Sequence, residues 1–262
     1  MKDFDEKKAI IKIEGGICSQ LAYYVLGKYL EDLQYDIKYD FSWFKTNGKD
    51  MNGIYARNYD LEKAFPAFKL PEASNEEIKL FSEKYNVSKN YEKFLDKMYI
   101  CDYPERLSLL PQYQEYLKEN FHPIDINSIS EIHEKIKSQT SCAIHVRRGD
   151  LSTYHKNYGY PQKPTYFIKT INAVLEWAND TKFFFFSDEC DWIYEEIVPI
   201  LPENIKYEIM TQNGSDKGYL DLWLMSKCDY IIASKGSMAR CAKFLSDNAI
   251  ALLAIEPFDA II

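Results

Sequence analysis

The sequence predicts an α/β protein whose second half is a parallel sheet with helices on both faces. Short continuous apolar runs alternate there with segments of helical period, and such runs are typical of strands buried on both sides. The runs end in polar or charged residues, as expected where the strands of an open sheet meet a ligand. We expect strands at residues 142–146, 182–186, 205–210, 230–233 and 250–255, separated by helices at residues 165–178, 191–197, 219–228 and 237–245.

The start of the chain predicts a second, smaller α/β unit. Residues 9–13 are an apolar run followed by two glycines, and residues 18–33 have helical period. A further strand is expected at residues 36–44. A glycine turn between a strand and a helix lets the backbone come close to a ligand.

A helical layer is expected between these two units, because the apolar spacing is mainly helical over residues 75–138. The short polar stretch at residues 137–140 then marks a boundary. It gives an N-terminal domain of residues 1–139 and a C-terminal domain of residues 140–262. The candidate helices of the layer are residues 76–85, 91–99, 112–120 and 126–137.

The composition argues against several classes of protein. Lys and Arg total 32 against 40 Asp and Glu, for a net charge of −8, so the basic surface that binds nucleic acid is not expected. The 6 cysteines form no CxxC pair and mostly lie in apolar runs, which favours buried free thiols in a reducing compartment. No long apolar segment follows the N-terminus, so neither a signal peptide nor a membrane anchor is indicated. We expect a cytoplasmic protein, and peripheral membrane association stays an alternative.

The segment CAIHVRRGD at residues 142–150 carries the sharpest functional signal. Arg147 and Arg148 end an expected strand, and their planar guanidinium groups match pairs of phosphate oxygens. We interpret them as the grip on a diphosphate; the alternative is a pair of surface salt bridges. His145 shares a strand face with Arg147 and is either a donor to a phosphate or ribose oxygen or a core histidine. Asp150 is expected to anchor the arginines, with helix capping and base catalysis as alternatives.

Polar residues after two further strands complete the expected anion site. Ser237 opens a predicted helix, with Gly236 before it, so backbone N–H groups and the positive helix end would face a phosphate. An ordinary N-cap explains Ser237 equally well. Ser187 and Asp188 follow a run of phenylalanines, and Asp188 could accept hydrogen bonds from a purine edge. The alternative for this pair is again a helix cap.

Motifs of metal-dependent chemistry are mostly absent from the sequence. It contains no HExxH, no cluster of His and Cys with ligand spacing, no GxSxG and no GxxxxGK[ST] phosphate loop. The Asp-x-Asp at residues 3–5 lies at the terminus, a poor place for a catalytic metal. We therefore expect no metal or other cofactor, with arginines and helix ends neutralising the diphosphate.

Four segments together resemble a known family. HVRRGD at residues 145–150 is similar to the HxRRxD motif of the bacterial α-1,2-fucosyltransferases, glycosyltransferase family 11. GGICSQL at residues 15–21 resembles the GGLGNQ-type segment of this family, FFSD at residues 185–188 its FSDD-type segment, and DLWLMS at residues 221–226 its DLxLMS stretch. The matches follow the order of the family along nearly the whole chain.

The resemblance implies a GT-B architecture, with two Rossmann-like domains that face a central cleft. It implies that Arg147 and Arg148 bind GDP-fucose in the C-terminal half. A galactose-containing glycan would be the acceptor, facing the N-terminal half beside Gly15, Gly16 and Gln20. The implied reaction is metal-independent and inverting, forms an α-1,2 linkage and belongs to polysaccharide biosynthesis.

Two carboxylates are candidates for the base that takes the proton from the acceptor hydroxyl. Glu14 lies beside the glycine turn and Asp150 beside the arginines, and each is either the base or a structural group.

Two segments depart from the pattern of the family. Cys18 and Ser19 stand where it has Gly and Asn, and residues 234–242 keep only Ser237 and the helix. The departures leave two alternatives open: a GT-B transferase that uses another nucleotide sugar, or a non-catalytic homologue that binds a nucleotide or a glycan.

Overall fold

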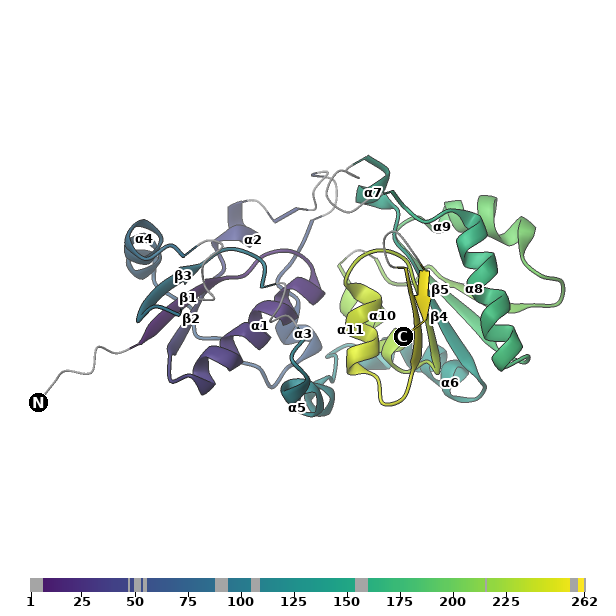
Figure 1. Ribbon diagram of the computed structural model, residues 1–262, viewed down its shortest axis with the longest axis horizontal. Coiled ribbons are helices and arrows are strands. Elements are labelled where there is room, and N and C mark those ends of the chain that lie inside the picture. Colours follow the sequence, from purple (N-terminus) through teal and green to yellow (C-terminus); the bar gives the residue numbers. More distant parts are fainter. Residues whose placement is uncertain are drawn as a thin grey trace, which may run out of the picture.

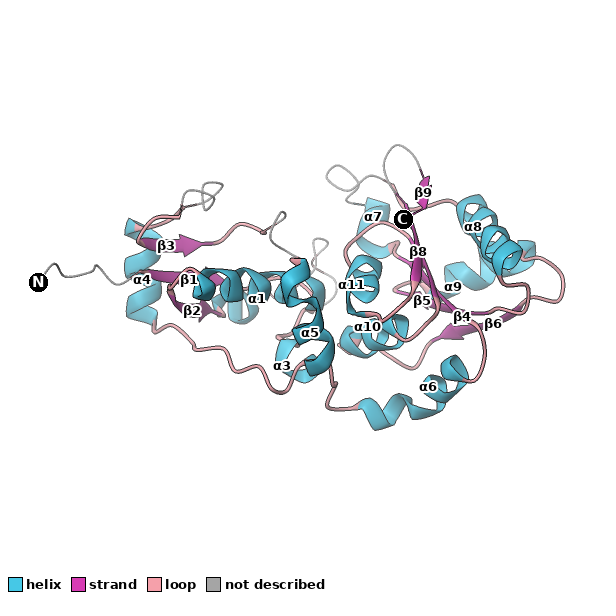
Figure 2. Ribbon diagram, turned by 60° about the horizontal axis from the view of Figure 1, so that its bottom comes forward, coloured by secondary structure: helices cyan, strands magenta, loops and turns pink. Residues whose placement is uncertain are grey.

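The chain folds into two α/β halves, each built on a sheet of its own (Figure 1). The second half carries helices on both faces of its sheet (Figure 2). The computed structural model describes residues 7–46, 48–49, 53, 56–87, 94–104, 109–153, 160–214, 216–254 and 259–261.

The N-terminal half contains β1 (Lys8–Lys12), α1 (Ile17–Asp32), β2 (Asp36–Asp40), α2 (Ser42–Thr46), α3 (Leu61–Ala64), α4 (Asn75–Lys84) and β3 (Lys97–Ile100). Its strands are all parallel, in the order β2-β1-β3. The expected first strand and the helix after the glycine turn are confirmed.

Helix α1 is buried on two sides, which explains why most of its length is apolar. Leu26 and Leu30 pack with Ile11 in the core of the small sheet. Leu21 and Val25 lie on another side of the helix, in a core cluster that includes helices of the second half. The helix therefore ties the small sheet to the rest of the molecule.

The helix expected at residues 91–99 is wrong over its described part, because its last residues belong to β3. Met98 and Ile100 pack in the core beside α1, while Tyr99 lies on the opposite face of the sheet. A run this short cannot separate a strand from a helix by its period, so pairing with β1 decides the conformation. Residues 91–93 lie outside the described residues.

The strand expected at residues 36–44 is too long. β2 ends at Asp40, whose Oδ1 accepts the backbone N–H of Ser42 at 2.7 Å and so starts helix α2. Sequence analysis also did not predict α3, where the apolar residues Leu61 and Ala64 are buried in the main core.

The two halves are joined by a helical segment, as expected. Its elements are the 3₁₀ turn η3 (Pro111–Tyr113), α5 (Gln114–Asn120), the 3₁₀ turn η4 (Ile126–Ile129) and α6 (Ser130–Lys137). The polar stretch at residues 137–140 leads from α6 into the first strand of the large sheet. The domain boundary after residue 139 stays a prediction.

The C-terminal half contains β4 (Ser141–Val146), α7 (Gly149–Thr153), α8 (Pro164–Trp177), β5 (Lys182–Ser187), α9 (Cys190–Trp192), the π-turn η5 (Ile193–Ile197), the 3₁₀ turn η6 (Val198–Ile200), β6 (Lys206–Met210), α10 (Gly218–Ser226), β7 (Tyr230–Ala233), α11 (Met238–Leu245), β8 (Ile250–Ala254) and β9 (Asp259–Ile261). The strand order is β6-β5-β4-β7-β8-β9. The expected alternation of strands and helices is confirmed, and α7 and β9 are additions to it.

The large sheet is parallel except at one edge. β4 to β8 run parallel, as expected, but β9 is antiparallel to β8. Too few residues separate Ala254 from Asp259 for the crossover that a parallel neighbour requires. The expected parallel sheet is therefore confirmed for β4 to β8, and β9 adds an antiparallel strand at its edge.

Alternate residues of the large sheet face different helices. Phe184 and Ala143 pack with α10 and α11, whereas Phe183 and Ile144 pack with α8. This arrangement confirms the expected cover of helices on both faces.

The two halves share one apolar core. Ile17 of α1 and Leu61 of α3 belong to the same buried cluster as Leu220 of α10 and Ala239 of α11. Hydrogen bonds cross the boundary too: Tyr219 donates to Asp125 at 2.8 Å, and Gln114 Nε2 donates to the carbonyl of Phe244 at 2.8 Å.

Two predictions from composition can be compared with the structure. All the cysteines are free thiols, most of them buried, as expected. No helix in the described residues has the length and hydropathy needed to cross a bilayer.

Candidate active site

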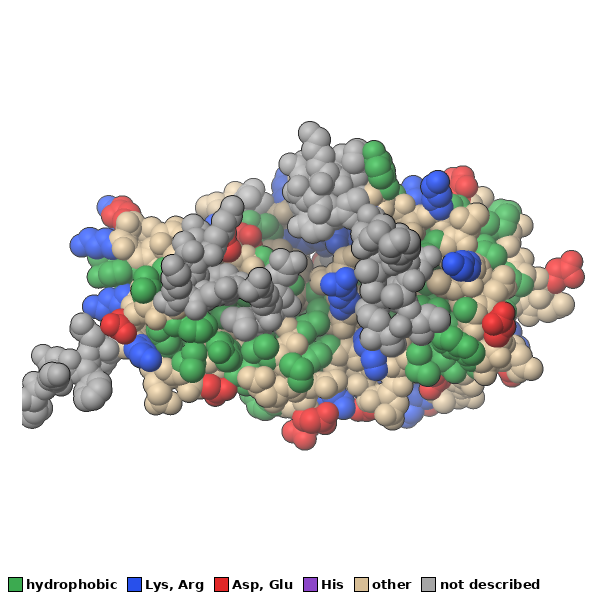
Figure 3. Space-filling view, in the orientation of Figure 1, with side chains coloured by type: hydrophobic (Ala, Val, Ile, Leu, Met, Phe, Trp, Pro, Cys, Tyr) green, Lys and Arg blue, Asp and Glu red, His purple; other side chains and the backbone are tan. Residues whose placement is uncertain are grey.

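The carboxyl ends of β4, β5 and β7 bring three loops together. Ser187 Oγ, at the end of β5, donates to the carbonyl of Val146 in β4 at 2.8 Å. The backbone N–H of Ser234, after β7, donates to the carbonyl of His145 at 3.0 Å. The arginine loop after β4 therefore lies between the other two, where the strands of a parallel sheet present their ligand-binding edge. Lys and Arg side chains lie at the hollow between the two halves (Figure 3).

Arg147 is held in one orientation by Asp150. Its Nε and Nη2 donate to the two oxygens of Asp150 at 3.0 and 2.6 Å, and the carboxylate is 6% exposed. The backbone N–H of Arg147 also donates to Ser234 Oγ at 2.8 Å. A two-point ion pair of this kind fixes the plane of the guanidinium group before any ligand arrives.

Gly236 allows the guanidinium group of Arg147 to lie against the loop after β7. A Cβ at Gly236 would stand 2.6 Å from Arg147 Nη1 and 3.2 Å from its Cδ, and the φ of this glycine is +108°. Both the close approach and the backbone angle require glycine.

Arg148 is oriented by two residues that sequence analysis did not single out. Its Nε donates to Glu189 Oε2 at 3.1 Å, and its guanidinium carbon lies 3.9 Å from the centre of the Trp192 ring. Both partners follow the FFSD segment, but only the folded chain brings them under the arginine. In the described part of the chain Glu189 occupies Nε only, so the terminal nitrogens can donate to an anion.

Asp188 holds the loop that carries the two arginines through a hydrogen bond to its backbone. Its Oδ1 accepts the backbone N–H of Arg148 at 3.0 Å, and a Cβ at Gly149 would lie 2.7 Å from its Oδ2. Burial raises the pKa of Asp188, and the backbone N–H groups of Arg148 and Gly149 oppose this rise. Ser187 Oγ accepts the N–H of Glu189 at 2.9 Å. Both side chains thus shape the loops at the site.

His145 is a buried neutral imidazole. It is 9% exposed, and its Nδ1 lies 3.4 Å from Ser234 Oγ. Burial and then the charge of Arg147 lower the pKa of His145 to about 3. The ring therefore carries no charge near neutral pH.

The N-terminus of α11 meets the N-terminal half. Ser237 occupies the N-cap position of this helix, as the alternative of an ordinary N-cap expects, but its side chain makes no capping hydrogen bond. The next residue, Met238, contacts Cys18 of α1 with a sulfur–sulfur distance of 3.8 Å. The glycine turn before α1 and the loop before α11 are thus neighbours across the two halves.

Gln20 fixes the glycine turn from inside the fold. Its side chain is fully buried and donates to the carbonyls of Gly15 and Asn58 at 2.9 and 2.8 Å. Its Oε1 accepts the backbone N–H groups of Asp60 and Leu61 at 2.8 and 3.0 Å. This amide makes every hydrogen bond that it needs within the protein, so its role in the fold is structural.

The remaining predicted residues of the N-terminal half are the two glycines of this turn and the glutamate before them. Gly15 has a φ of +79°, whereas a Cβ at Gly16 would meet nothing within 4 Å. Glu14 precedes them, and burial raises its pKa; the charge of Lys12 lowers it and that of Asp102 raises it.

We expect Gln20→Leu to destabilise the protein by about 3 kcal/mol or more, because it takes the partner from two buried backbone N–H groups, each worth about 1–3 kcal/mol, and from two partly buried carbonyls. Urea denaturation measures the loss. Gln112→Leu, at an exposed position, is the control and should stay within about 0.5 kcal/mol of wild type. An equal stability of the two variants would contradict the structural role of Gln20.

Asp221 is a further titratable group beside the site. It opens the DLWLMS segment in the first turn of α10, and its Oδ1 accepts a hydrogen bond from Asn213 Nδ2 at 2.7 Å. Burial raises the pKa of Asp221 to about 7, and the hydrogen bond from Asn213 opposes the rise. The resemblance covered this segment, but sequence alone could not show the environment of its carboxyl group.

This shift predicts a pH dependence of stability. Between about pH 4 and 7 the folded protein keeps a proton on Asp221 that the unfolded chain releases, so this contribution to stability is lost as the pH rises toward 7. Asp221→Asn should therefore match wild type in urea denaturation at pH 4 and exceed it at pH 8, by at most about 1.4 kcal/mol per pKa unit of the shift. Asp36→Asn, at an exposed carboxylate, is the control. A constant difference between Asp221→Asn and wild type at both pH values would contradict the shift.

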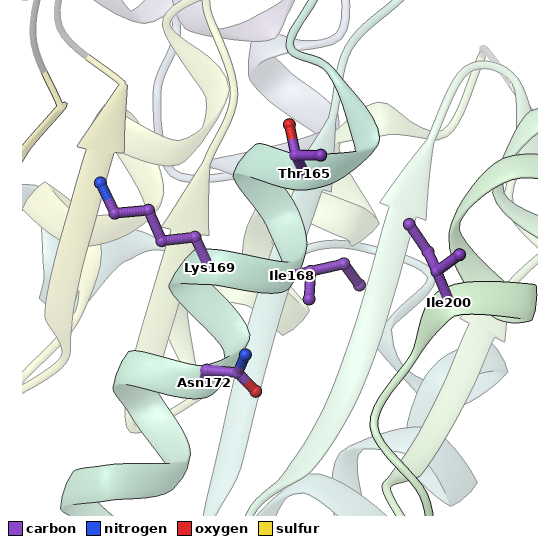
Figure 4. A pocket seen from close by; sticks show the side chains of 5 residues that line it. All are labelled: Thr165, Ile168, Lys169, Asn172 and Ile200. Carbon is purple, nitrogen blue, oxygen red and sulfur yellow. The ribbon is translucent and has the colours of Figure 1, made fainter.

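Among the described residues, no group of three or more His, Cys, Asp or Glu side chains could hold a metal ion. A groove of about 390 Å³ lies between α8 and η6, lined by Thr165, Ile168, Lys169, Asn172 and Ile200 (Figure 4). The lining of this groove is mainly apolar and contains no pair of arginines, so the groove does not match the expected diphosphate site.

Sequence comparison decides the family. Glycosyl transferase family 11 matches residues 56–260, which is most of the chain. The chain belongs to this family. The match confirms the resemblance to family 11 that the four motifs indicate. No curated protein matches the sequence.

Solved structures share the fold of the chain at low sequence identity. The fucosyltransferase NodZ from Bradyrhizobium is 13% identical with a TM-score of 0.58, over 98% of each chain. POFUT1 in complex with GDP is 10% identical with a TM-score of 0.52, over 94% of this chain and 98% of that one. A mutant of Arabidopsis thaliana FUT1 in complex with GDP is 12% identical with a TM-score of 0.51, over 97% of this chain and 71% of that one. These likenesses confirm the GT-B architecture.

Proposed function

We propose that the protein transfers fucose from GDP-fucose to a hydroxyl of a galactose-containing glycan, forming an α-1,2 linkage with inversion at the sugar carbon. The observation that carries this proposal is the pair of guanidinium groups at the carboxyl edge of the large sheet, each oriented by a carboxylate. Membership of family 11 supports fucose as the transferred sugar, and the fold likeness to structures solved with GDP supports this nucleotide.

The proposed chemistry depends on stabilising the leaving group. When the acceptor hydroxyl attacks the anomeric carbon, negative charge grows on the β-phosphate of GDP. Arg147, Arg148 and the backbone beside Gly236 and Ser237 take up this charge. Since the arginines are fixed before the reaction, little reorganisation opposes it, and such donors are worth about 3–4 kcal/mol each in other enzymes.

The two candidate bases differ in their surroundings. Both oxygens of Asp150 are occupied by Arg147, which supports a role as anchor. Glu14 lies on the acceptor side with a raised pKa, which suits a group that receives a proton late in the reaction. We therefore assign the base to Glu14 and keep Asp150 as the residue that positions Arg147.

The remaining assignments follow from position. We propose that residues 140–262 hold the donor, with His145, Ser187 and Asp188 contributing beneath the ribose and the purine, and that residues 1–139 hold the acceptor. The reaction is proposed to need no metal ion, because the arginines and the helix end neutralise the diphosphate. We place the protein in the cytoplasm, with peripheral association at the inner face of the membrane as the alternative. Its net charge of −8 argues against a nucleic-acid partner.

The test is to incubate the protein with GDP-fucose and a panel of neutral β-galactosides, in the presence of EDTA, and to identify products by mass spectrometry. A mass gain of one deoxyhexose, with the linkage assigned by NMR, is the expected result. Thermal stabilisation by GDP, UDP and TDP is measured in parallel, and GDP should give the largest shift.

Two outcomes would replace the proposal. A larger shift with UDP or TDP would identify another nucleotide sugar, for which the altered segment at residues 234–242 is the reason to look. Binding of GDP without transfer to any acceptor would identify a non-catalytic homologue.

A further inference from the structure

The carboxyl edge of the small sheet gathers carboxylates and tyrosines. Ile11 of β1 pairs with Ile100 of β3 in parallel register, so the residues that follow the two strands lie at the same edge. Glu14 follows β1, and Asp102 and Tyr103 follow β3. In Figure 2 the strands β1, β2 and β3 point toward the second half, so this edge faces it.

Tyr23 of α1 supplies an unusual group at this edge. Its side chain is fully buried, and its hydroxyl has no hydrogen-bond partner among the described residues. Its ring lies edge-on to that of Tyr103, with centroids 6.1 Å apart. By contrast, Tyr99 at the same edge donates to Asp40 at 2.6 Å. Buried polar groups are normally satisfied, so the lone hydroxyl of Tyr23 points to a partner that the described residues do not supply.

The electrostatics of this edge define what it could bind. Burial raises the pKa of Tyr23, and the charges of Glu14 and Asp102 raise it further, which shows that both carboxylates act on its hydroxyl. The charge of Asp102 also acts on Glu14, with Lys12 as the opposing cation. A surface with this excess of carboxylates repels anions and attracts uncharged donors of hydrogen bonds.

The same edge adjoins the proposed donor site. Glu14 immediately precedes the glycine turn that leads into α1. Cys18 of α1 touches Met238, the first residue of α11 after Ser237. A molecule bound at the edge would therefore lie beside the loop that we propose to hold the diphosphate.

We propose that Glu14, Asp102, Tyr103 and Tyr23 form a subsite for one neutral, hydroxyl-rich sugar ring of the acceptor. The carboxylates accept hydrogen bonds from its hydroxyls, and the Tyr23 hydroxyl, which is buried in the free protein, becomes accessible on binding and pairs with another. The ring of Tyr103, which is 41% exposed, covers its apolar face. This inference rests on the proposed function. Because the two carboxylates repel anions, the subsite should reject acidic sugars.

The test uses Tyr23→Phe and Tyr103→Ala, with methyl β-galactoside and lactose as probes in the presence of GDP. Tyr23→Phe removes one oxygen atom that has no partner in the fold. It should raise the melting temperature and yet weaken binding of the probes about tenfold, a combination that a purely structural tyrosine does not give. Tyr103→Ala should weaken binding by a similar factor. Affinity is measured by NMR titration, and the KM of each probe by transfer from GDP-fucose.

Two variants at exposed positions of the second half serve as controls, Tyr207→Phe and Tyr194→Ala, which should leave affinity and KM at wild-type values. GDP affinity should be unchanged in all four variants. Probe binding that is absent in wild type, or that survives both Tyr23→Phe and Tyr103→Ala, would overturn the subsite. Loss of GDP binding in the wild-type protein would instead reject the proposed function, so the two failures are distinguishable.

Discussion

Arg147→Ala should lower the rate of fucose transfer by about 10²–10³-fold, the usual effect of removing one well-placed donor to a developing negative charge. It should also weaken GDP binding, and Arg148→Ala should act in the same direction. Arg147→Lys is expected to fail substantially as well, because an ammonium group cannot reproduce the two-point pair with Asp150. The rates are measured with GDP-fucose and lactose, and GDP affinity by calorimetry.

Stability has to be separated from catalysis in this experiment. Arg147→Ala leaves the buried carboxylate of Asp150 without its cation, and breaking such a pair costs about 3–5 kcal/mol. Adding Asp150→Asn removes the stranded charge, so the double variant should regain stability without regaining activity. Arg240→Ala, at an exposed position of α11, controls for the loss of a positive charge. Near-wild-type transfer by both Arg147→Ala and Arg147→Lys would refute the diphosphate grip.

Gly236→Ala should lower kcat/KM by about 10²-fold, an effect of the size expected when a catalytic group is displaced by about 1 Å. The added methyl group would stand 2.6 Å from Arg147 Nη1, and the arginine can yield only by leaving Asp150 or by turning its fork away from the site. The backbone angle of +108° adds strain of about 1–3 kcal/mol.

Gly53→Ala is the matched control for this prediction. Gly53 also has a positive φ, of +70°, but a Cβ there would meet nothing within 4 Å. It therefore reports the cost of backbone strain alone, as a lower melting temperature with unchanged kcat/KM. If the two alanine variants lost activity equally, contact with Arg147 would not be the cause.

The large sheet could be predicted because each of its central strands is apolar on both faces, a local property of the sequence. β3 could not, since four residues carry no readable period and their conformation depends on pairing with β1. The strand β9 is antiparallel because the connection after β8 is short. The pattern of apolar residues does not indicate the direction of a strand.

The candidate site shows the same division. Arg147 and Asp150 lie three residues apart, so their pairing could be proposed from sequence. Glu189 and Trp192 contact Arg148 only because β5 lies beside β4, and nothing local marks them as its partners. Gln20 resembles a ligand-binding residue in the motif, yet its four hydrogen bonds all go to backbone groups distant in sequence or across the turn. Partners set by tertiary packing are the ones that sequence reasoning misses.

The apolar core that runs from α1 and α3 into α10 and α11 limits how far the two lobes can swing apart. A wide hinge opening would expose this apolar surface to water. Substrate exchange should therefore rely on small movements of the loops that surround the site. For the same reason the lobes should melt in a single cooperative transition. Fragments produced by severing the chain after residue 139 should aggregate unless they are refolded together.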